Sequence, residues 1–183
     1  MAIEKKKQNK IVGALICLVV LFLITLLVIA IIASQTTGRN FDDCFFGACC
    51  GSLYITGMAL GFTYKEICVI VNIYLEAGLC FLSGLWVTWI CISSYRSKKT
   101  LGTMILMLFG VVYGLTYIVA FIMLCKHYAM PMNDAFDLCF MELVALAREY
   151  HTTYNNVNYV VFIFLFLVCT LGNITVAKLI KKL

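Results

Sequence analysis

Charged residues are scarce in this sequence of 183 residues. They make up 13% of the chain, whereas hydrophobic residues make up 63%, and a soluble domain carries about 25% charged residues. This scarcity excludes an ordinary soluble globule, a disordered tail and a nucleic-acid-binding module, so no nucleic-acid partner is expected. Together with a mean hydropathy of +1.00, it predicts a small membrane protein that forms a single domain over residues 1–183.

Catalytic and metal-binding motifs are missing as well. The two histidines, His127 and His151, lie far apart in the sequence, and neither belongs to an H-E-x-x-H motif. The sequence also contains no C-x-x-C pair, no G-x-S-x-G motif and no glycine-rich phosphate loop. We therefore predict a protein that is not an enzyme and that holds no metal and no cofactor.

Four long apolar stretches are present instead. A helix needs about 20 mostly apolar residues to cross a hydrocarbon core of roughly 30 Å. The predicted fold class is therefore an all-α membrane protein, a four-transmembrane-helix bundle. Its spans lie at about 11–33, 67–93, 101–125 and 157–177, its outer loops at about 34–66 and 126–156, and its inner loop at about 94–100.

Basic residues are distributed unevenly around these spans. With the N-terminus in the cytoplasm, ten lysines and arginines lie inside, among them Arg96, Lys98 and Lys181, and only four lie outside. Because cytoplasmic loops carry an excess of Lys and Arg, both termini are predicted to be cytoplasmic. The cysteines of the outer loops favour the plasma membrane over endosomal or secretory-pathway membranes.

Two alternatives to this topology concern the N-terminal third of the chain. Segment 44–64 has no charged residue, but a fifth crossing there places Arg96, Lys98 and Lys99 outside, against the charge rule. Its four glycines also disfavour an isolated helix by about 1 kcal/mol each, so we predict an ordered, membrane-hugging outer loop or an extension of the second helix. The other alternative is a signal peptide, but an apolar run of 23 residues in 11–33 exceeds the usual length of about 7–15.

Four of the ten cysteines belong to the body of the predicted outer loops: Cys44, Cys49, Cys50 and Cys139. Disulfides are expected among them because the exterior is oxidising. A bond from Cys139 to a cysteine of the first loop would link the two loops. The sequence leaves the connectivity open.

A short amphipathic helix is predicted in the second outer loop. Asn133 or Asp134 can cap its first turn. Phe136, Phe140 and Val144 then recur every four residues and form one apolar stripe. Such a helix either covers the bundle or holds a partner, so these three side chains are candidate partner-binding residues.

Glu76 is the most informative residue inside a predicted span. It shares one helical face with Asn72 and Ser83, while Asn158 is a polar position of the last span. A carboxylate within the membrane faces the bundle interior or water, and it is a functional candidate by default. Two interpretations remain open: Glu76 joins helices through hydrogen bonds, or it lines an ion path.

Gly110 and Gly114 form a G-x-x-x-G motif in the third span, which predicts close packing against another helix. The cytoplasmic segments are too short for a signalling domain. We therefore expect an accessory subunit or membrane organiser that binds a larger membrane protein, or copies of itself, laterally in the lipid bilayer. The alternative is a small oligomeric ion channel or transporter in which Glu76 faces the pathway.

Overall fold

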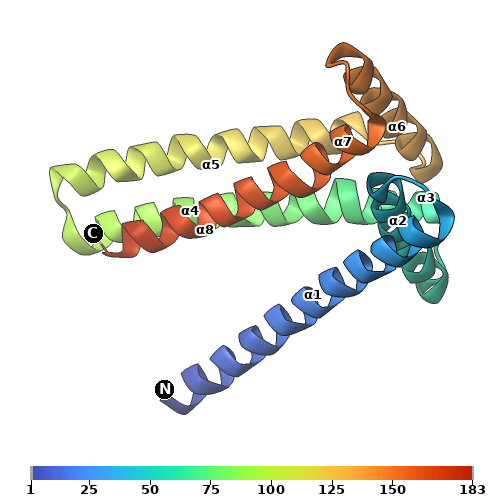
Figure 1. The fold of residues 1–183 in the computed structure, drawn as a ribbon. Helices are drawn as coiled ribbons and strands as arrows, with labels where there is room; N and C mark the ends of the chain where they lie inside the picture. The colour runs from blue at the N-terminus through green and yellow to red at the C-terminus, as the bar shows by residue number, and fades with distance from the viewer. Residues whose placement is uncertain (1, 183) are drawn as a thin grey trace. The chain divides into compact units, whose positions relative to one another are not determined.

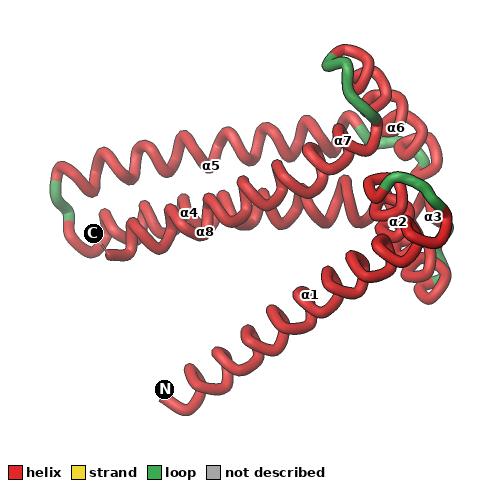
Figure 2. The backbone as a smooth tube through the Cα atoms, in the orientation of Figure 1, coloured by secondary structure: helices red, strands yellow, loops and turns green. Residues whose placement is uncertain are grey.

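The structure is a computed structural model that describes residues 2–182, with side chains from Val20 to Lys181, and its regular elements in that range are all helices (Figures 1 and 2). Five helical segments are long and apolar enough to cross a membrane, which is one more than the sequence predicted. The chain divides into two compact units, Met1–Gly61 and Phe62–Leu183.

The first unit contains two helices. Helix α1 covers Ala2–Thr37 and α2 covers Phe41–Leu60. Gly38 lies in the connection between them with a φ of 68°, a left-handed conformation that glycine adopts without steric cost. The chain turns there, so α2 leaves in a different direction from α1 (Figure 1), and the two helices contact each other.

Helix α2 corrects the prediction that segment 44–64 is a loop. Asp42 and Asp43 lie in the first turn of the helix, where carboxylates interact favourably with the helix dipole. The helix ends at Gly61, whose left-handed backbone lets its N–H bond the Met58 carbonyl at 3.3 Å. The glycine penalty used in the prediction applies to helices in water. Helix α2 forms despite its four glycines and packs against α1, and packing contributes more to the stability of a helix in a protein than intrinsic propensity does.

The second unit consists of three long helical segments and a shorter helix. The first segment combines α3 (Tyr64–Cys68), η1 (Val69–Leu75) and α4 (Glu76–Lys98), and α5 (Leu101–His127) follows. Helix α6 (Met132–Glu149) precedes the last segment, which combines α7 (Tyr154–Asn158), η2 (Tyr159–Leu165) and α8 (Phe166–Lys182). Helix α4 packs against both α5 and α8.

The two ends of this unit differ, and we name them for what they carry. At the capped end lie α3, α6, α7 and the last turn of α5. At the basic end lie the last turn of α4, the first turn of α5 and the last turn of α8 (Figure 1). Threonine side chains cap the starts of the three long segments: Thr63, Thr100 and Thr153 each accept a hydrogen bond from a backbone N–H three residues on.

Helices α4 and α5 approach each other closely through glycine. A Cβ atom added to Gly110 would lie 2.5 Å from the Cys91 Cβ, and one added to Gly114 would lie 2.6 Å from the Thr88 Oγ1. The Thr88 hydroxyl also donates a 3.0 Å hydrogen bond to the Gly110 carbonyl oxygen. The structure therefore places both residues of the G-x-x-x-G motif directly against α4.

The first and last segments of the unit follow the same pattern of elements. Each consists of five α-helical residues, seven π-helical residues and a long α-helix, and the boundaries up to the start of the long α-helix differ by 90 residue numbers. Hydrogen bonds join equivalent positions, since Asn173 bonds Ser83 and Cys80 bonds Thr170. The two segments therefore lie side by side, parallel and in register.

The expected disulfides are absent from the described part of the chain, where all nine cysteines are free thiols. Cys44, Cys49 and Cys50 lie within α2 rather than in a loop. Cys139 packs into the hydrophobic clusters beneath α6, where burial raises the pKa of its thiol. The prediction of a disulfide-linked pair of loops is therefore not confirmed in the described residues, where these cysteines pack in helices as small apolar residues do.

Candidate functional site

A cavity of about 620 Å³ lies near the capped end of the second unit. Its walls come from η1 and α4, from α5, and from η2 and α8, and α6 closes it at the capped end. Its lining is almost entirely apolar, and it includes only a few polar groups, such as Asn72, Glu76 and Glu142. Its volume is in the range of ligand pockets, about 300–1,000 Å³. We call it the Glu76 cavity.

Both π-helical segments line this cavity. Asn72 and Ile73 come from η1, while Val161, Phe162 and Leu165 come from η2. A π-helix is wider than an α-helix, and it is rare outside short segments that often occur at functional sites. Two such segments therefore line the cavity at the same level of the parallel helices.

Glu76 follows η1 directly, and its half-buried side chain faces the cavity. Within the described part of the chain, no group donates a hydrogen bond to its carboxyl and no cation pairs with it. Carboxyl groups at membrane depth are costly unless they are hydrogen-bonded or hydrated. The Glu76 carboxyl on the largely apolar wall of the cavity therefore needs a hydrogen-bond donor or water that the described residues do not supply.

Helix α6 is held over the cavity by polar contacts on both sides. The Tyr128 hydroxyl donates a 2.6 Å hydrogen bond to Glu142, and the His127 Nε2 lies 2.6 Å from the other oxygen of that carboxyl. On the α3 side, the Lys65 ammonium lies 2.6 and 2.8 Å from the two oxygens of Asp137. These contacts position Leu143, which is buried in the cluster beneath the helix.

The Glu142 carboxyl is tuned by opposing effects. Partial burial raises its pKa, but the hydrogen bonds from Tyr128 and His127 lower it by more, so the pKa lies below its ordinary value. For Tyr128 both burial and the bond to the carboxylate raise the pKa of the phenol. The pair is therefore arranged with Glu142 ionised and Tyr128 protonated.

A cluster of polar side chains separates the Glu76 cavity from the basic end. Asn173, which is 2% exposed, donates from its amide nitrogen to the Ser83 hydroxyl at 2.8 Å and to the Tyr117 hydroxyl at 3.1 Å. Its amide oxygen accepts a hydrogen bond from Tyr113. Below this Asn173 cluster, Val87 and Ala177 are fully buried between α4 and α8. The cavity therefore ends at the Asn173 cluster.

The structure separates the residues of the predicted polar face. Asn72 and Glu76 line the cavity, Ser83 belongs to the Asn173 cluster, and Asn158 donates to the Tyr154 hydroxyl at 3.2 Å at the capped end. Sequence reasoning missed the Asn173 cluster as a site. The sequence did contain one indication of this cluster: Tyr113 and Tyr117 lie one turn apart on the helix that carries the G-x-x-x-G motif.

The candidate partner-binding residues of α6 do not share one environment. Phe136 is half-buried, with its ring 5.9 Å from that of Tyr64 and 5.5 Å from the Lys65 ammonium. Phe140 is 41% exposed, although its ring lies 5.1 Å from that of Tyr154. Val144 is half-buried. Phe136 therefore anchors α6 to α3, and Phe140 is the one of the three that remains largely accessible.

No family model, curated protein or solved structure matches this chain. The described residues contain no group of three or more His, Cys, Asp or Glu side chains that could hold a metal ion. The candidate site is thus an apolar cavity that bears the Glu76 carboxyl and that α6 closes at the capped end.

Proposed function

We propose that this chain is a non-enzymatic accessory subunit or membrane organiser that binds another membrane protein laterally through its spans and α6. One observation carries the proposal: the Glu76 carboxyl has no donor among the described residues of its own chain. A hydroxyl, indole or guanidinium group on a partner helix would supply that donor. Such polar contacts hold helices together within membranes.

The test places a photo-crosslinking residue in the cavity at Leu165 and a matched one at Val112, an exposed residue of α5 outside the cavity. The complex is then purified from native membranes in mild detergent and weighed by native mass spectrometry. A membrane protein present in fixed ratio, and cross-linked from position 165 but not 112, supports the proposal. Recovery of the chain alone, or only with lipid, contradicts it. Recovery as copies of itself identifies the partner as a second copy.

Two substitutions at Glu76 refine this test. Glu76→Gln keeps a carbonyl oxygen that accepts a hydrogen bond, whereas Glu76→Leu removes both oxygens. A partner that donates to this residue tolerates Gln and is lost with Leu. If Leu leaves the complex intact, Glu76 does not contact the partner.

We further propose that four of the five candidate helices cross the bilayer and that α2 lies at its outer surface. Four crossings put both termini in the cytoplasm with the basic end of the second unit, in agreement with the excess of Lys and Arg there. Glycosylation tags inserted after Gly61 and after Lys99 distinguish the two topologies. Modification of the first tag alone supports four crossings, and modification of the second alone means that α2 also crosses.

The second candidate function is an ion channel or transporter subunit. It is supported by the location of Glu76 in a cavity at membrane depth. The Asn173 cluster and the packed residues below it close this route within one chain, so a path would have to form between chains. A current in reconstituted bilayers that disappears in Glu76→Gln would favour this function over the accessory role.

A further inference from the structure

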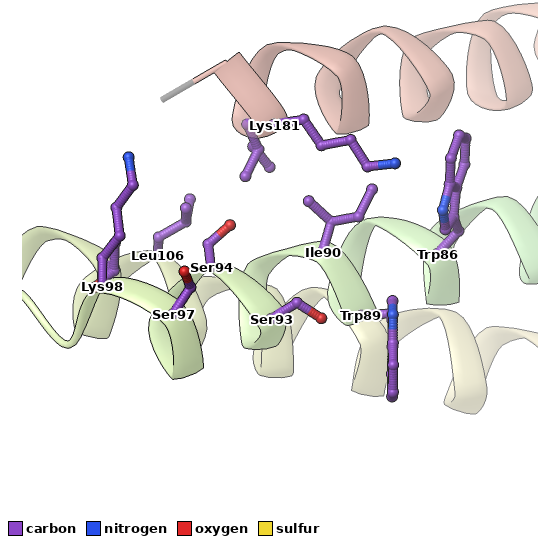
Figure 3. Close-up of a pocket in the computed structure, with 11 residues that line it drawn as sticks. Trp86, Trp89, Ile90, Ser93, Ser94, Ser97, Lys98, Leu106 and Lys181 are labelled. Atoms are coloured by element: carbon purple, nitrogen blue, oxygen red, sulfur yellow. The ribbon is translucent and has the colours of Figure 1, made fainter. Parts of the chain in front are cut away.

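A second pocket, of about 400 Å³, lies at the basic end of the second unit between the last turns of α4, the start of α5 and the end of α8. We call it the basal pocket (Figure 3). Its floor is formed by Ile90, Leu106 and Ile180, and two lysines and three serines surround that floor. No acidic residue lines it among the described residues. The pocket therefore combines positive charge, hydroxyl donors and an apolar base.

The lysines come from two helices that are far apart in the sequence. Lys98 ends α4, and Lys181 reaches from α8 toward Trp86, with its ammonium 5.4 Å from the centre of that ring (Figure 3). The surrounding sequence has the same sign, since 94–104 and 176–183 contain six basic residues and no acidic one. A ligand that enters the pocket meets two basic side chains from different helices.

The serines are distinguished by what their hydroxyls do. Most helical hydroxyls of this chain bond a carbonyl of their own helix, as Ser83 bonds Cys80 and Thr175 bonds Leu171. Ser93, Ser94 and Ser97 make no hydrogen bond within the described part of the chain. Figure 3 shows them on α4, between Lys98 and Trp89. Three hydroxyl donors in the lining of the pocket are therefore unused.

The tryptophans indicate where the rest of the ligand lies. Trp86 and Trp89 also line the pocket, and they are 40% and 63% exposed. Tryptophan is enriched at membrane interfaces, at the level of the lipid headgroups. A ligand whose phosphate meets the lysines and serines can therefore lay a hydrocarbon chain along these rings.

From these four features we propose that the basal pocket binds the phosphate of an anionic phospholipid headgroup, with the acyl chains against Trp86 and Trp89. A phosphate oxygen accepts hydrogen bonds from hydroxyl and ammonium donors. Basic pockets between membrane helices are suited to acidic headgroups. A soluble phosphate offers the same oxygens but has no chain for the tryptophans, and the test below separates the two sources.

The chain carries its own probe, because its two tryptophans both line this pocket. Protein in phosphatidylcholine nanodiscs is titrated with brominated phosphatidylglycerol, which quenches tryptophan on contact, or with brominated phosphatidylcholine as the matched neutral lipid. We expect half-maximal quenching at an about fivefold lower fraction of the anionic lipid. Equal quenching by the two lipids would overturn the proposal.

Lys181→Gln should remove most of this preference. Its matched control is Lys178→Gln, which removes the same charge one turn earlier on α8, outside the lining of the pocket. An equal loss in both variants would show attraction to the surface as a whole and would contradict a site. A combined Ser93→Ala and Ser97→Ala variant keeps every charge and should lower the preference about twofold, whereas an unchanged preference means that these hydroxyls do not hold the phosphate.

A final experiment with inorganic phosphate distinguishes a lipid headgroup from a soluble phosphate as the ligand. Millimolar phosphate added to phosphatidylcholine nanodiscs, at constant ionic strength, should leave the tryptophan emission and the lipid preference unchanged. If phosphate shifts the emission and competes with the brominated anionic lipid, the ligand is a soluble phosphate and the lipid assignment is wrong.

Discussion

The capped end and the basic end of the second unit are built from the same three helical segments, yet they are organised differently. Toward the basic end, glycines and the Asn173 cluster bring the helices together, and the charges beyond them have one sign. At the capped end, the helices part around a cavity and the charges are paired across elements. Both regions are strongly apolar, so hydrophobicity alone does not decide where membrane helices touch. Small residues and polar contacts do.

Among the substitutions that test this difference, Gly110→Leu should lower the free energy of unfolding the most. A side chain there collides with Cys91, and the whole α4–α5 contact must open. Overpacking of this kind typically costs 1–3 kcal/mol, and we expect about 3 kcal/mol in the free energy of unfolding, measured in mixed micelles. Gly78→Leu is the control, since nothing lies within 4 Å of a Cβ at that position. Equal losses would mean that close approach is not what glycine provides.

Asn173→Leu should have the next largest effect, and it tests the Asn173 cluster at which the Glu76 cavity ends. The substitution leaves Ser83, Tyr113 and Tyr117 without their common partner. Hydrogen bonds between membrane helices contribute about 0.6 kcal/mol on average and up to about 1.7, so we expect a loss of about 2 kcal/mol in the same assay. Thr175→Val, whose hydroxyl serves only its own helix, should cost less than 0.5 kcal/mol. A smaller loss for Asn173→Leu than for this control would contradict a structural cluster.

The attachment of α6 should depend on pH through Glu142. Its pKa is lowered in the folded protein, so its contribution is fully present above its unfolded pKa of about 4.5 and is lost as the pH falls through the folded value. Hydrogen exchange of α6 should accelerate a few-fold in acid relative to exchange of α5. Glu142→Gln should show the faster rate already at neutral pH, whereas Glu149→Gln on the same helix should not. Identical pH profiles for wild type and Glu142→Gln would exclude this carboxyl as the cause.

The Lys65–Asp137 pair should have the smallest effect. Both side chains are well exposed, and exposed ion pairs contribute 0–1 kcal/mol and weaken with salt. A double-mutant cycle with Lys65→Gln and Asp137→Asn should give a coupling of about 0.5 kcal/mol at low ionic strength, and less at high salt. A coupling above 2 kcal/mol would mean that this pair, rather than the packing of Phe136, anchors α6.

The sequence was informative where the signal is local. Apolar runs indicated every long helix of the second unit, and a helix stands where the stripe of Phe136, Phe140 and Val144 suggested one. It begins at Met132 after Pro131, not at the polar residues chosen as its cap, and its position outside the membrane stays a prediction. The two π-helical segments were not predicted, because the hydropathy pattern of a span does not distinguish a π-helix from an α-helix.

Sequence reasoning was weaker for contacts between distant positions. It identified Glu76 and the glycine motif, each visible within one span. It did not pair Ser83 with Asn173, because a match 90 residues apart requires knowledge of which helices are parallel neighbours. Helix α2 was missed for a different reason: the cost of glycine in an isolated helix was applied to a segment that packs against α1.

The length of the central segment has a consequence for the lipid around it. Tyr64–Lys98 contains 35 residues, about 50 Å of helix at 1.5 Å per residue, whereas a bilayer with its headgroups measures about 40–45 Å. Such a helix must tilt, protrude or thicken the membrane locally, and each response costs a fraction of a kcal/mol per Å. Bilayer thickness is thus a variable to which this segment responds, and its tilt should be smaller in a thick membrane than in a thin one.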